Sequence, residues 1–299
     1  MSEKDAPETK LKAEHITLPK HGKNIQQHTP PSQMLPSYRA DIPFILALGL
    51  ITTVYVTLIV GMLTAMVFYV ELPVIGEVFT NDRYRYAVLL SLISCSITTI
   101  LSVWVAVPTA YLMSRVEFPG KRLLDGILDI PIVLPPLVIG LALLMLFQTG
   151  AGQFVQGYVR FTYAIPGVIL AQFMVACAFA IRTMMAAFAE INPRQEQVAM
   201  TLGCSRAQAF WWVVLPEVRQ GMIPAATIAW ARAMGEFGPV LVFAGTTAKR
   251  TEVMPTSVFL ELQVGNLSMA AGISIVMVVL AIAVLMLMRI AGRGTSTFV

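Results

Sequence analysis

Six long apolar stretches follow one another along most of the chain, and each is long enough to form a membrane-spanning helix. They cover about 43–70, 86–113, 123–148, 164–189, 222–246 and 267–290. A spanning helix needs about 20 apolar residues, whereas a strand of an outer-membrane barrel has about 9–11 residues of alternating polarity. The pattern therefore predicts an all-α polytopic membrane protein with about six transmembrane helices. The stretch 222–246 fits least well because it contains Arg232 and Glu236.

The composition excludes most other classes of protein. Apolar residues make up 57% of the 299 residues and charged residues only 13%, against about 45–50% and about 25% in soluble domains. This excludes a soluble enzyme, a disordered protein and a secreted disulfide scaffold. The three cysteines have no metal-binding spacing, and all three histidines lie before residue 29. We therefore expect no metal site, no catalytic residue and no nucleic-acid partner.

The polar segments predict how the chain is organised and oriented. Residues 1–41 are polar with charges of both signs, which is typical of a disordered tail; 42–292 would be the membrane domain, and 293–299 a short C-terminus. With the N-terminus inside, fourteen Lys and Arg lie on the cytoplasmic side and five outside. Cytoplasmic loops carry the excess of basic residues. Both termini are therefore expected in the cytoplasm.

The loop at about 190–221 is long and unusually apolar for a cytoplasmic loop. Asn192 and Pro193 are typical of a helix start and Gly203 of a helix end. A second short helix is expected from Ser205 to Pro216, with several aromatic residues. Such an apolar segment indicates either a docking site for a partner or a helix pair lying on the lipid surface.

Two further stretches combine polar groups with helix-breaking residues. Pro135 and Pro136 should open the helix 123–148, either as a hinge that lines a pathway or as a fixed kink. Arg232 and Glu236 are four residues apart and would share a helix face. They could form a gate or a structural ion pair, and the neighbouring Phe237 lies in a glycine-rich, flexible setting.

Other polar residues in the spans have simpler interpretations. Asp125 and Asp129 also share a helix face, and we interpret them as acids favoured near a helix N-terminus. The stretch 86–113 carries hydroxyl groups that could pack helices together or line a polar pathway. They are Ser91, Ser94, Ser96, Thr98, Thr99 and Ser102.

The cytoplasmic loop resembles the coupling motif of ABC importer permeases. The resemblance lies in QVAMTLGCSRAQAFWWVVLP, from Gln197 to Pro216, where Gly203 and Leu215–Pro216 have the motif's spacing. Gln197 stands where the motif has glutamate, and Glu196 lies one position earlier. The residues that the resemblance assigns to coupling with an ATP-binding subunit are Glu196, Ala199, Gly203, Val213, Leu215 and Pro216.

Two more stretches are similar to the permeases of molybdate, tungstate and sulfate importers. They are DIPIVLPPLVIGLALLMLFQTGAG (129–152) and ARAMGEFGPVLVFAG (231–245). The resemblance implies a type I importer permease fold that forms the pathway for a tetrahedral oxyanion. Candidate pathway or gate residues are Arg232, Glu236, Phe237, Pro135 and Pro136.

The same resemblance implies the partners and the location. An ABC ATP-binding subunit would hold ATP and magnesium, so this chain would bind no cofactor. An extracytoplasmic oxyanion-binding protein would deliver the anion, and a second permease copy, as a homodimer, would complete the pathway in the lipid of a prokaryotic inner membrane. The alternative is an ATP-independent secondary transporter or channel.

Overall fold

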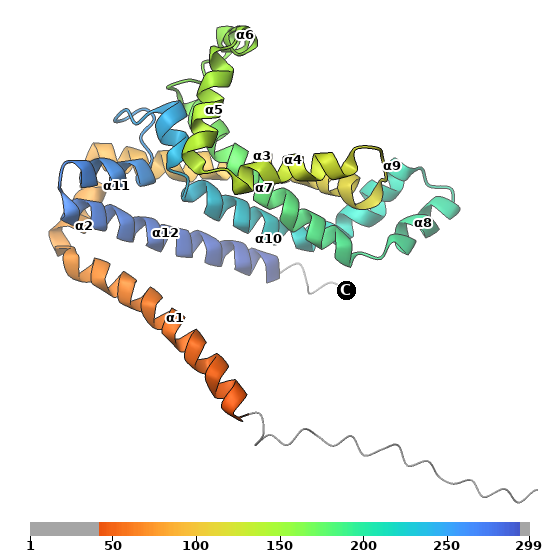
Figure 1. Ribbon diagram of the computed structural model, residues 1–299, viewed down its shortest axis with the longest axis horizontal. Coiled ribbons are helices and arrows are strands. Elements are labelled where there is room, and N and C mark those ends of the chain that lie inside the picture. Colours follow the sequence, from red (N-terminus) through yellow and green to blue (C-terminus); the bar gives the residue numbers. More distant parts are fainter. Residues whose placement is uncertain (1–41, 294–299) are drawn as a thin grey trace, which may run out of the picture. The chain divides into compact units, whose positions relative to one another are not determined.

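The computed structural model describes residues 42–293, which form helices and connecting segments without a β-strand (Figure 1). The helices are α1 (Ile42–Tyr69), α2 (Leu72–Thr80), α3 (Asp82–Arg115), α4 (Lys121–Val133), α5 (Pro136–Gln148), α6 (Gly150–Tyr158), α7 (Ile165–Glu190), α8 (Pro193–Thr201), α9 (Arg206–Ala209), the π-helix η1 (Phe210–Val214), α10 (Leu215–Met234), the π-helix η2 (Val240–Ala244), α11 (Met254–Gln263) and α12 (Leu267–Arg293).

Four of these helices, α1, α3, α7 and α12, are long and apolar enough to cross a membrane, and α4 with α5 makes a fifth if the bent pair is one span. The all-α polytopic fold is thus confirmed. The helix α1 is an unbroken run of 28 residues without a charged side chain. The expected tail 1–41 and most of the expected C-terminal segment 293–299 lie outside the described residues.

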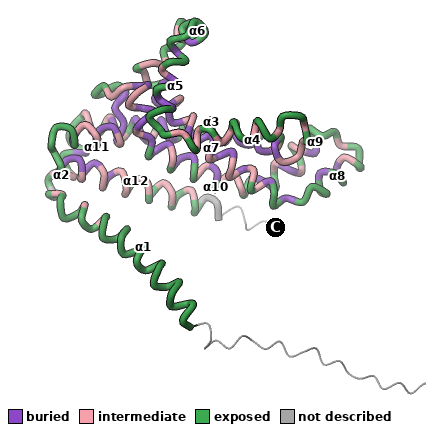
Figure 2. Tube along the Cα trace, in the orientation of Figure 1, coloured by how far each residue is buried: buried purple, intermediate pink, exposed green. Residues whose placement is uncertain are grey.

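The core of the part from residue 59 onward is built by α3, α7 and α10, which lie side by side (Figures 1 and 2). Small side chains fill the contacts between these helices and allow the backbones to approach closely. Fully buried examples are Ala106, Ala110, Ala176, Ala180, Ala225 and Ala229. The larger Phe188 and Trp230 fill the remaining space, at 0% and 1% exposure.

The hydroxyl groups of α3 pack helices together. The Thr98 hydroxyl donates to the carbonyl of Ile169 and to the side chain of Gln172 on α7, each at 3.3 Å. The Ser91 oxygen accepts the backbone N–H of Met254 at 2.8 Å. Ser91 and Thr98 are both buried, so these two hydroxyl groups of α3 do not line an open pathway.

The third apolar stretch is two helices, not one. An angle of 112° separates α4 from α5. Pro136 begins α5, and its ring cannot continue the preceding helix because the proline nitrogen has no proton to donate. Leu134 and Pro135 are extended between the helices. The expected break at the double proline is therefore confirmed.

The fifth apolar stretch differs from the continuous span expected at 222–246. The helix α10 begins earlier, at Leu215, and ends at Met234; Gly235 is a turn, and η2 follows from Val240. This stretch does not meet the length and hydropathy criteria of a single span. The glycines and the proline after Met234 interrupt the helix.

The loop expected at 190–221 is helical, with one correction to its bounds. Asn192 caps α8 through the N–H of Arg194, and the N–H of Gly203 bonds to the carbonyl of Met200 after the helix end. The second helix does not stop at Pro216. It continues from α9 through η1 into α10, and the wider π-helical turn Phe210–Val214 comes directly before Pro216 in the chain.

Candidate functional site

The two helix breaks pack directly on each other. A Cβ atom placed on Gly238 would lie 3.0 Å from the backbone nitrogen of Leu137 and 3.2 Å from Cβ of Pro136. A Cβ on Gly140 would lie 2.8 Å from Cα of Pro239. The absent side chains therefore allow the segment after α10 to contact the start of α5. The structure thus brings together the two stretches 129–152 and 231–245.

Arg232 and Glu236 form an ion pair beside this contact. Arg232 lies in the last turn of α10, and its Nη2 is 2.7 Å from Oε1 of Glu236. Glu236 follows the end of the helix, so the expectation that both lie on one helix is wrong, although the pairing exists. The glutamate side chain is 2% exposed, against 40% for the arginine. The pair therefore presents its cation toward open space.

Further contacts hold the Arg232 guanidinium in place. Its Cζ lies 4.8 Å from the ring centroid of Phe179 on α7, a cation–π contact. Its Nε is buried without a hydrogen-bond partner among the described residues. The buried Nε is out of reach of an anion, whereas the exposed part of the side chain, 40% of its surface, can donate to one.

The other candidate gate residues, Phe237, Pro135 and Pro136, differ in what they contact. The Phe237 ring lies 4.8 Å from the ring of Phe259 on α11. Pro136 contacts Gly238 as described, and both Pro135 and Pro136 are exposed at the bend. The break at 134–135 and the break at 235–237 therefore form one site, with Phe237 on its α11 side.

The acidic residue of the coupling motif points into the protein. Glu196 is 6% exposed. The Tyr111 hydroxyl donates to its Oε1 at 2.5 Å, and Nε of Arg115 lies 3.9 Å from its Oε2. Nη2 of Arg115 also donates to the carbonyls of Phe188 and Ile191 at the end of α7. Glu196 therefore attaches α8 to α3, and its carboxylate is not presented to an outside partner.

The segment 190–221 exposes several large apolar side chains. Gly203 has φ +97°, a left-handed conformation that favours glycine. Around this turn, large apolar side chains are exposed: Val198 57%, Leu202 81%, Trp211 62% and Trp212 71%. Among the residues expected to couple, Pro216 is exposed, Val213 and Leu215 are half-buried, and Ala199 is buried.

A cluster of three charges on α4 and α7 was missed from the sequence. Nη1 of Arg182 lies 2.6 Å from Oδ1 of Asp125, and Nη2 lies 2.6 Å from Oδ2 of Asp129. The interpretation of these aspartates as acids of a helix N-terminus is therefore wrong, since α4 begins at Lys121 and both carboxylates bind Arg182. An intramembrane arginine requires a partner, and the acids four residues apart were the available signal.

A second missed cluster lies at the start of α3. Nε of Arg83 donates to both carboxylate oxygens of Glu252, at 3.0 and 2.9 Å, and Nη1 lies 3.3 Å from Oε1 of Glu261. The hydroxyls of Tyr84 and Ser257 donate to Glu261 and Glu252. Both carboxylates are buried and each is satisfied, so this cluster attaches α11 to α3.

The chain belongs to the family of binding-protein-dependent transport system inner membrane components, whose pattern matches residues 100–296. It is thus a multi-pass inner-membrane permease subunit of an ABC importer, a class whose members do not hydrolyse ATP themselves.

The relatives include sulfate and molybdenum permeases. The chain is 34% identical over 217 residues to the sulfate transport system permease protein CysT of Salmonella typhimurium, which covers 72% of this chain and 78% of that protein. It is 32% identical over 211 residues to the molybdenum transport system permease protein ModB of Escherichia coli, covering 68% and 91%. The resemblance to the oxyanion permeases is confirmed.

Solved structures show the same fold. A bacterial alginate ABC transporter in complex with a periplasmic protein matches with a TM-score of 0.68 and 19% identity, over 87% of this chain and 98% of that chain. The MetNI methionine ABC transporter in an inward-facing conformation matches with a TM-score of 0.53 and 18% identity, over 72% and 98%.

Proposed function

We propose that this chain forms the translocation pathway for a tetrahedral oxyanion of the molybdate, tungstate and sulfate class. The observation that carries the proposal is the contact between the two helix breaks, at 134–135 and 235–237, beside the Arg232–Glu236 ion pair. A guanidinium with unused donors suits a multivalent oxyanion. The sequence similarity to both sulfate and molybdenum permeases supports this substrate class.

The cytoplasmic segment is the docking site for the ATP-binding subunit. Leu202 and the two tryptophans are large apolar side chains exposed on a short helical unit, and exposed apolar groups on a water-facing segment mark partner contacts. Gly203, Val213, Leu215 and Pro216 shape this unit. ATP and magnesium belong to the partner subunit, and this chain binds no cofactor.

The complete importer contains two copies of this chain and an extracytoplasmic oxyanion-binding protein. Both termini lie in the cytoplasm, which places 190–221 on the side of ATP. The permease alternates between two states of similar free energy, and its ligands shift their balance. The breaks at Pro135–Pro136 and Gly235–Phe237 are the points at which α5 and η2 change direction between these states.

Uptake by reconstituted vesicles tests this function. The chain is purified with its ATP-binding subunit, placed in liposomes and supplied with its binding protein and radioactive sulfate or molybdate. We expect at least one of these anions to accumulate in the liposomes. This accumulation should require ATP for the partner subunit and should persist when an uncoupler is added. Uptake that ignores ATP and stops with an uncoupler would instead establish an ATP-independent secondary transporter.

A further inference from the structure

One face of α7 carries a series of groups that lead away from Arg232. Phe179, Arg182 and Met185 are three residues apart along the helix and therefore lie on one face. Arg232 stacks on Phe179. Nη1 of Arg182 lies 3.7 Å from the sulfur of Met185. The series therefore connects the candidate gate with the cytoplasmic end of α7.

The α4–α7 ion cluster, formed by Arg182, Asp125 and Asp129, lies in the middle of this series. Besides the two ion pairs, Nε of Arg182 donates to Asp129 at 2.6 Å and Nη2 to the backbone carbonyl of Asp125 at 3.0 Å. All three guanidinium nitrogens are thus engaged. The cluster has two negative charges and one positive charge.

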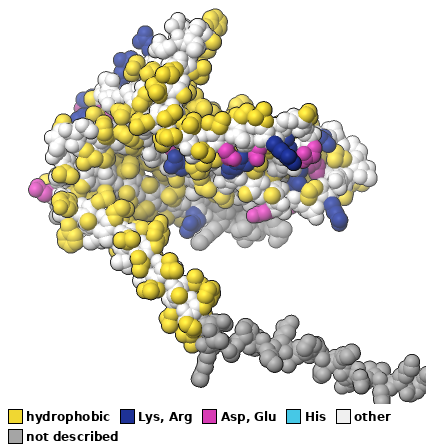
Figure 3. Space-filling model, in the orientation of Figure 1, with side chains coloured by type: hydrophobic (Ala, Val, Ile, Leu, Met, Phe, Trp, Pro, Cys, Tyr) yellow, Lys and Arg dark blue, Asp and Glu magenta, His cyan; other side chains and the backbone are white. Residues whose placement is uncertain are grey.

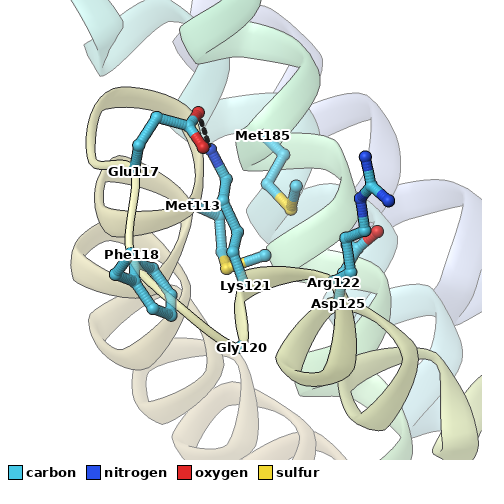
Figure 4. Close-up of a pocket in the computed structure, with 8 residues that line it drawn as sticks. All are labelled: Met113, Glu117, Phe118, Gly120, Lys121, Arg122, Asp125 and Met185. Carbon is cyan, nitrogen blue, oxygen red and sulfur yellow. Dashed lines mark hydrogen bonds and ion pairs between the residues drawn. The ribbon is translucent and has the colours of Figure 1, made fainter.

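A cavity of about 520 Å³ adjoins the cluster and ends at the turn between α3 and α4. Figure 4 shows Met185 and Asp125 on its walls, together with Lys121, whose ammonium meets Glu117. Arg122, on the same wall, makes no ion pair within the described residues. The cavity therefore links the ion cluster to charged groups at the cytoplasmic end.

The charges of the cluster argue against a face covered by lipid. Each aspartate side chain is 45% exposed and Arg182 is 29% exposed, and ionised groups at membrane depth face a wet cavity or a bundle interior. Figure 3 shows acidic and basic side chains in a row beside α4, surrounded by hydrophobic surface. The exposed apolar residues of α4 lie on its remaining surface: Leu123, Ile127, Ile130 and Val133.

We propose that the cytoplasmic half of the anion route follows this face of α7, and that the α4–α7 ion cluster is its electrostatic barrier. This inference rests on the proposed function for the substrate class and for the side of the membrane. In the present conformation Arg182 has no donor left for an oxyanion, and the cluster's net charge of −1 repels one. Passage requires α4 to move from α7 about the Pro135–Pro136 bend.

Charged thiol reagents measure this barrier without transport. Met185→Cys is made in a chain with Cys204→Ser and assembled with its ATP-binding subunit in membrane vesicles open to the reagent from the cytoplasmic side. Anionic sulfonatoethyl and cationic trimethylammonioethyl methanethiosulfonate are applied separately. Their ratio of labelling rates cancels any change in the reactivity of the thiol itself.

The expected ratios move in opposite directions for opposite charge changes. Asp125→Asn removes one negative charge, and the anionic-to-cationic ratio should rise about threefold; Arg182→Gln removes the positive charge, and it should fall about threefold. If Arg182→Gln does not fold, the triple variant Arg182→Gln, Asp125→Asn, Asp129→Asn keeps hydrogen-bonding groups. It has no net charge and should match Asp125→Asn.

Two control variants test whether the labelling is specific to this face of α7 and to the charges of the ion cluster. Trp104→Cys on α3, at a position that is 74% exposed on the apolar surface, should label with neither reagent. Asp82→Asn, in an exposed pair at the start of α3, should leave the Met185→Cys ratio unchanged. Absent labelling of Met185→Cys, or one ratio shared by Asp125→Asn and Arg182→Gln, would overturn the barrier.

Failure of this inference is distinct from failure of the proposed function. If wild-type vesicles accumulate sulfate or molybdate with ATP while the labelling ratios stay constant, the oxyanion function stands and the barrier is wrong. If the ratios move as expected but no tested oxyanion accumulates, the charged route exists and the substrate class is wrong.

Discussion

At the scale of single residues, a side chain's neighbours decide its role more than its position in a motif. Glu196 and Gln197 are adjacent in the coupling motif, yet the carboxylate is buried against Tyr111 and Arg115 while Gln197 is exposed. The acidic group therefore holds α8 in place, and a neutral amide occupies the outward position.

Replacing Glu196 tests this assignment. In Glu196→Ala the Tyr111 hydroxyl and the Arg115 guanidinium lose a buried partner, which should lower the free energy of unfolding by about 1–3 kcal/mol. Thermal unfolding in detergent measures the loss. Glu196→Gln should recover part of the stability, because its amide oxygen still accepts from Tyr111.

The matched control is the neighbouring Gln197→Ala, which should leave the unfolding temperature unchanged since its side chain is exposed. Equal unfolding temperatures for Glu196→Ala and Gln197→Ala would show that the buried contacts do not stabilise the chain.

At the scale of helices, the contact between α5 and the segment before η2 depends on two glycines without room for a side chain. The segments that meet there lie about a hundred residues apart in the sequence, so no local pattern predicts their contact. The double proline did predict the break itself, because a missing backbone donor is a local property.

Gly140→Ala should destabilise the fold by about 1–3 kcal/mol, because its Cβ would lie 2.8 Å from Cα of Pro239 and force the segments apart. Thermal unfolding and ATP-dependent uptake should both fall. The control is Gly126→Ala in α4, where nothing lies within 4 Å of the new Cβ. An unfolding temperature for Gly140→Ala equal to that of Gly126→Ala would refute the close contact.

At the scale of the whole chain, the length of the apolar stretches predicted α1, α3, α7 and α12 closely, whereas the third stretch is the bent pair α4 and α5. The helix α1 begins within one residue of the expected stretch, whereas α10 begins seven residues before 222 and ends at Met234. Arg182 could not be paired with Asp125 from the sequence, because helix spacing specifies neighbours within one helix and says nothing of contacts between helices. The helical unit at 190–221 could be predicted, since its caps are local signals.

Assembly with the ATP-binding subunit tests the docking surface at this scale. Leu202→Glu places a charge on the 81% exposed side chain at the tip of the helical unit at 190–221, and desolvating it in an interface should cost the partner at least about tenfold in affinity. Affinity purification with mass spectrometry measures the recovered subunit.

The control is Val264→Glu, which places the same charge on a side chain between α11 and α12 that is 75% exposed. This change should leave the amount of recovered ATP-binding subunit unchanged. Equal recovery with Leu202→Glu and with wild type would place the docking surface elsewhere.

The attachment of α8 to α3 also has a mechanical consequence. The helical unit at 190–221 is joined to the membrane helices covalently, through η1 into α10, and a second time through the Tyr111 and Arg115 contacts of Glu196. A helical unit attached at two points moves together with both attachments, whereas one attached at a single point can pivot about it. Force applied to this unit would therefore reach α3 and α10 together, and both helices would move as one rigid body.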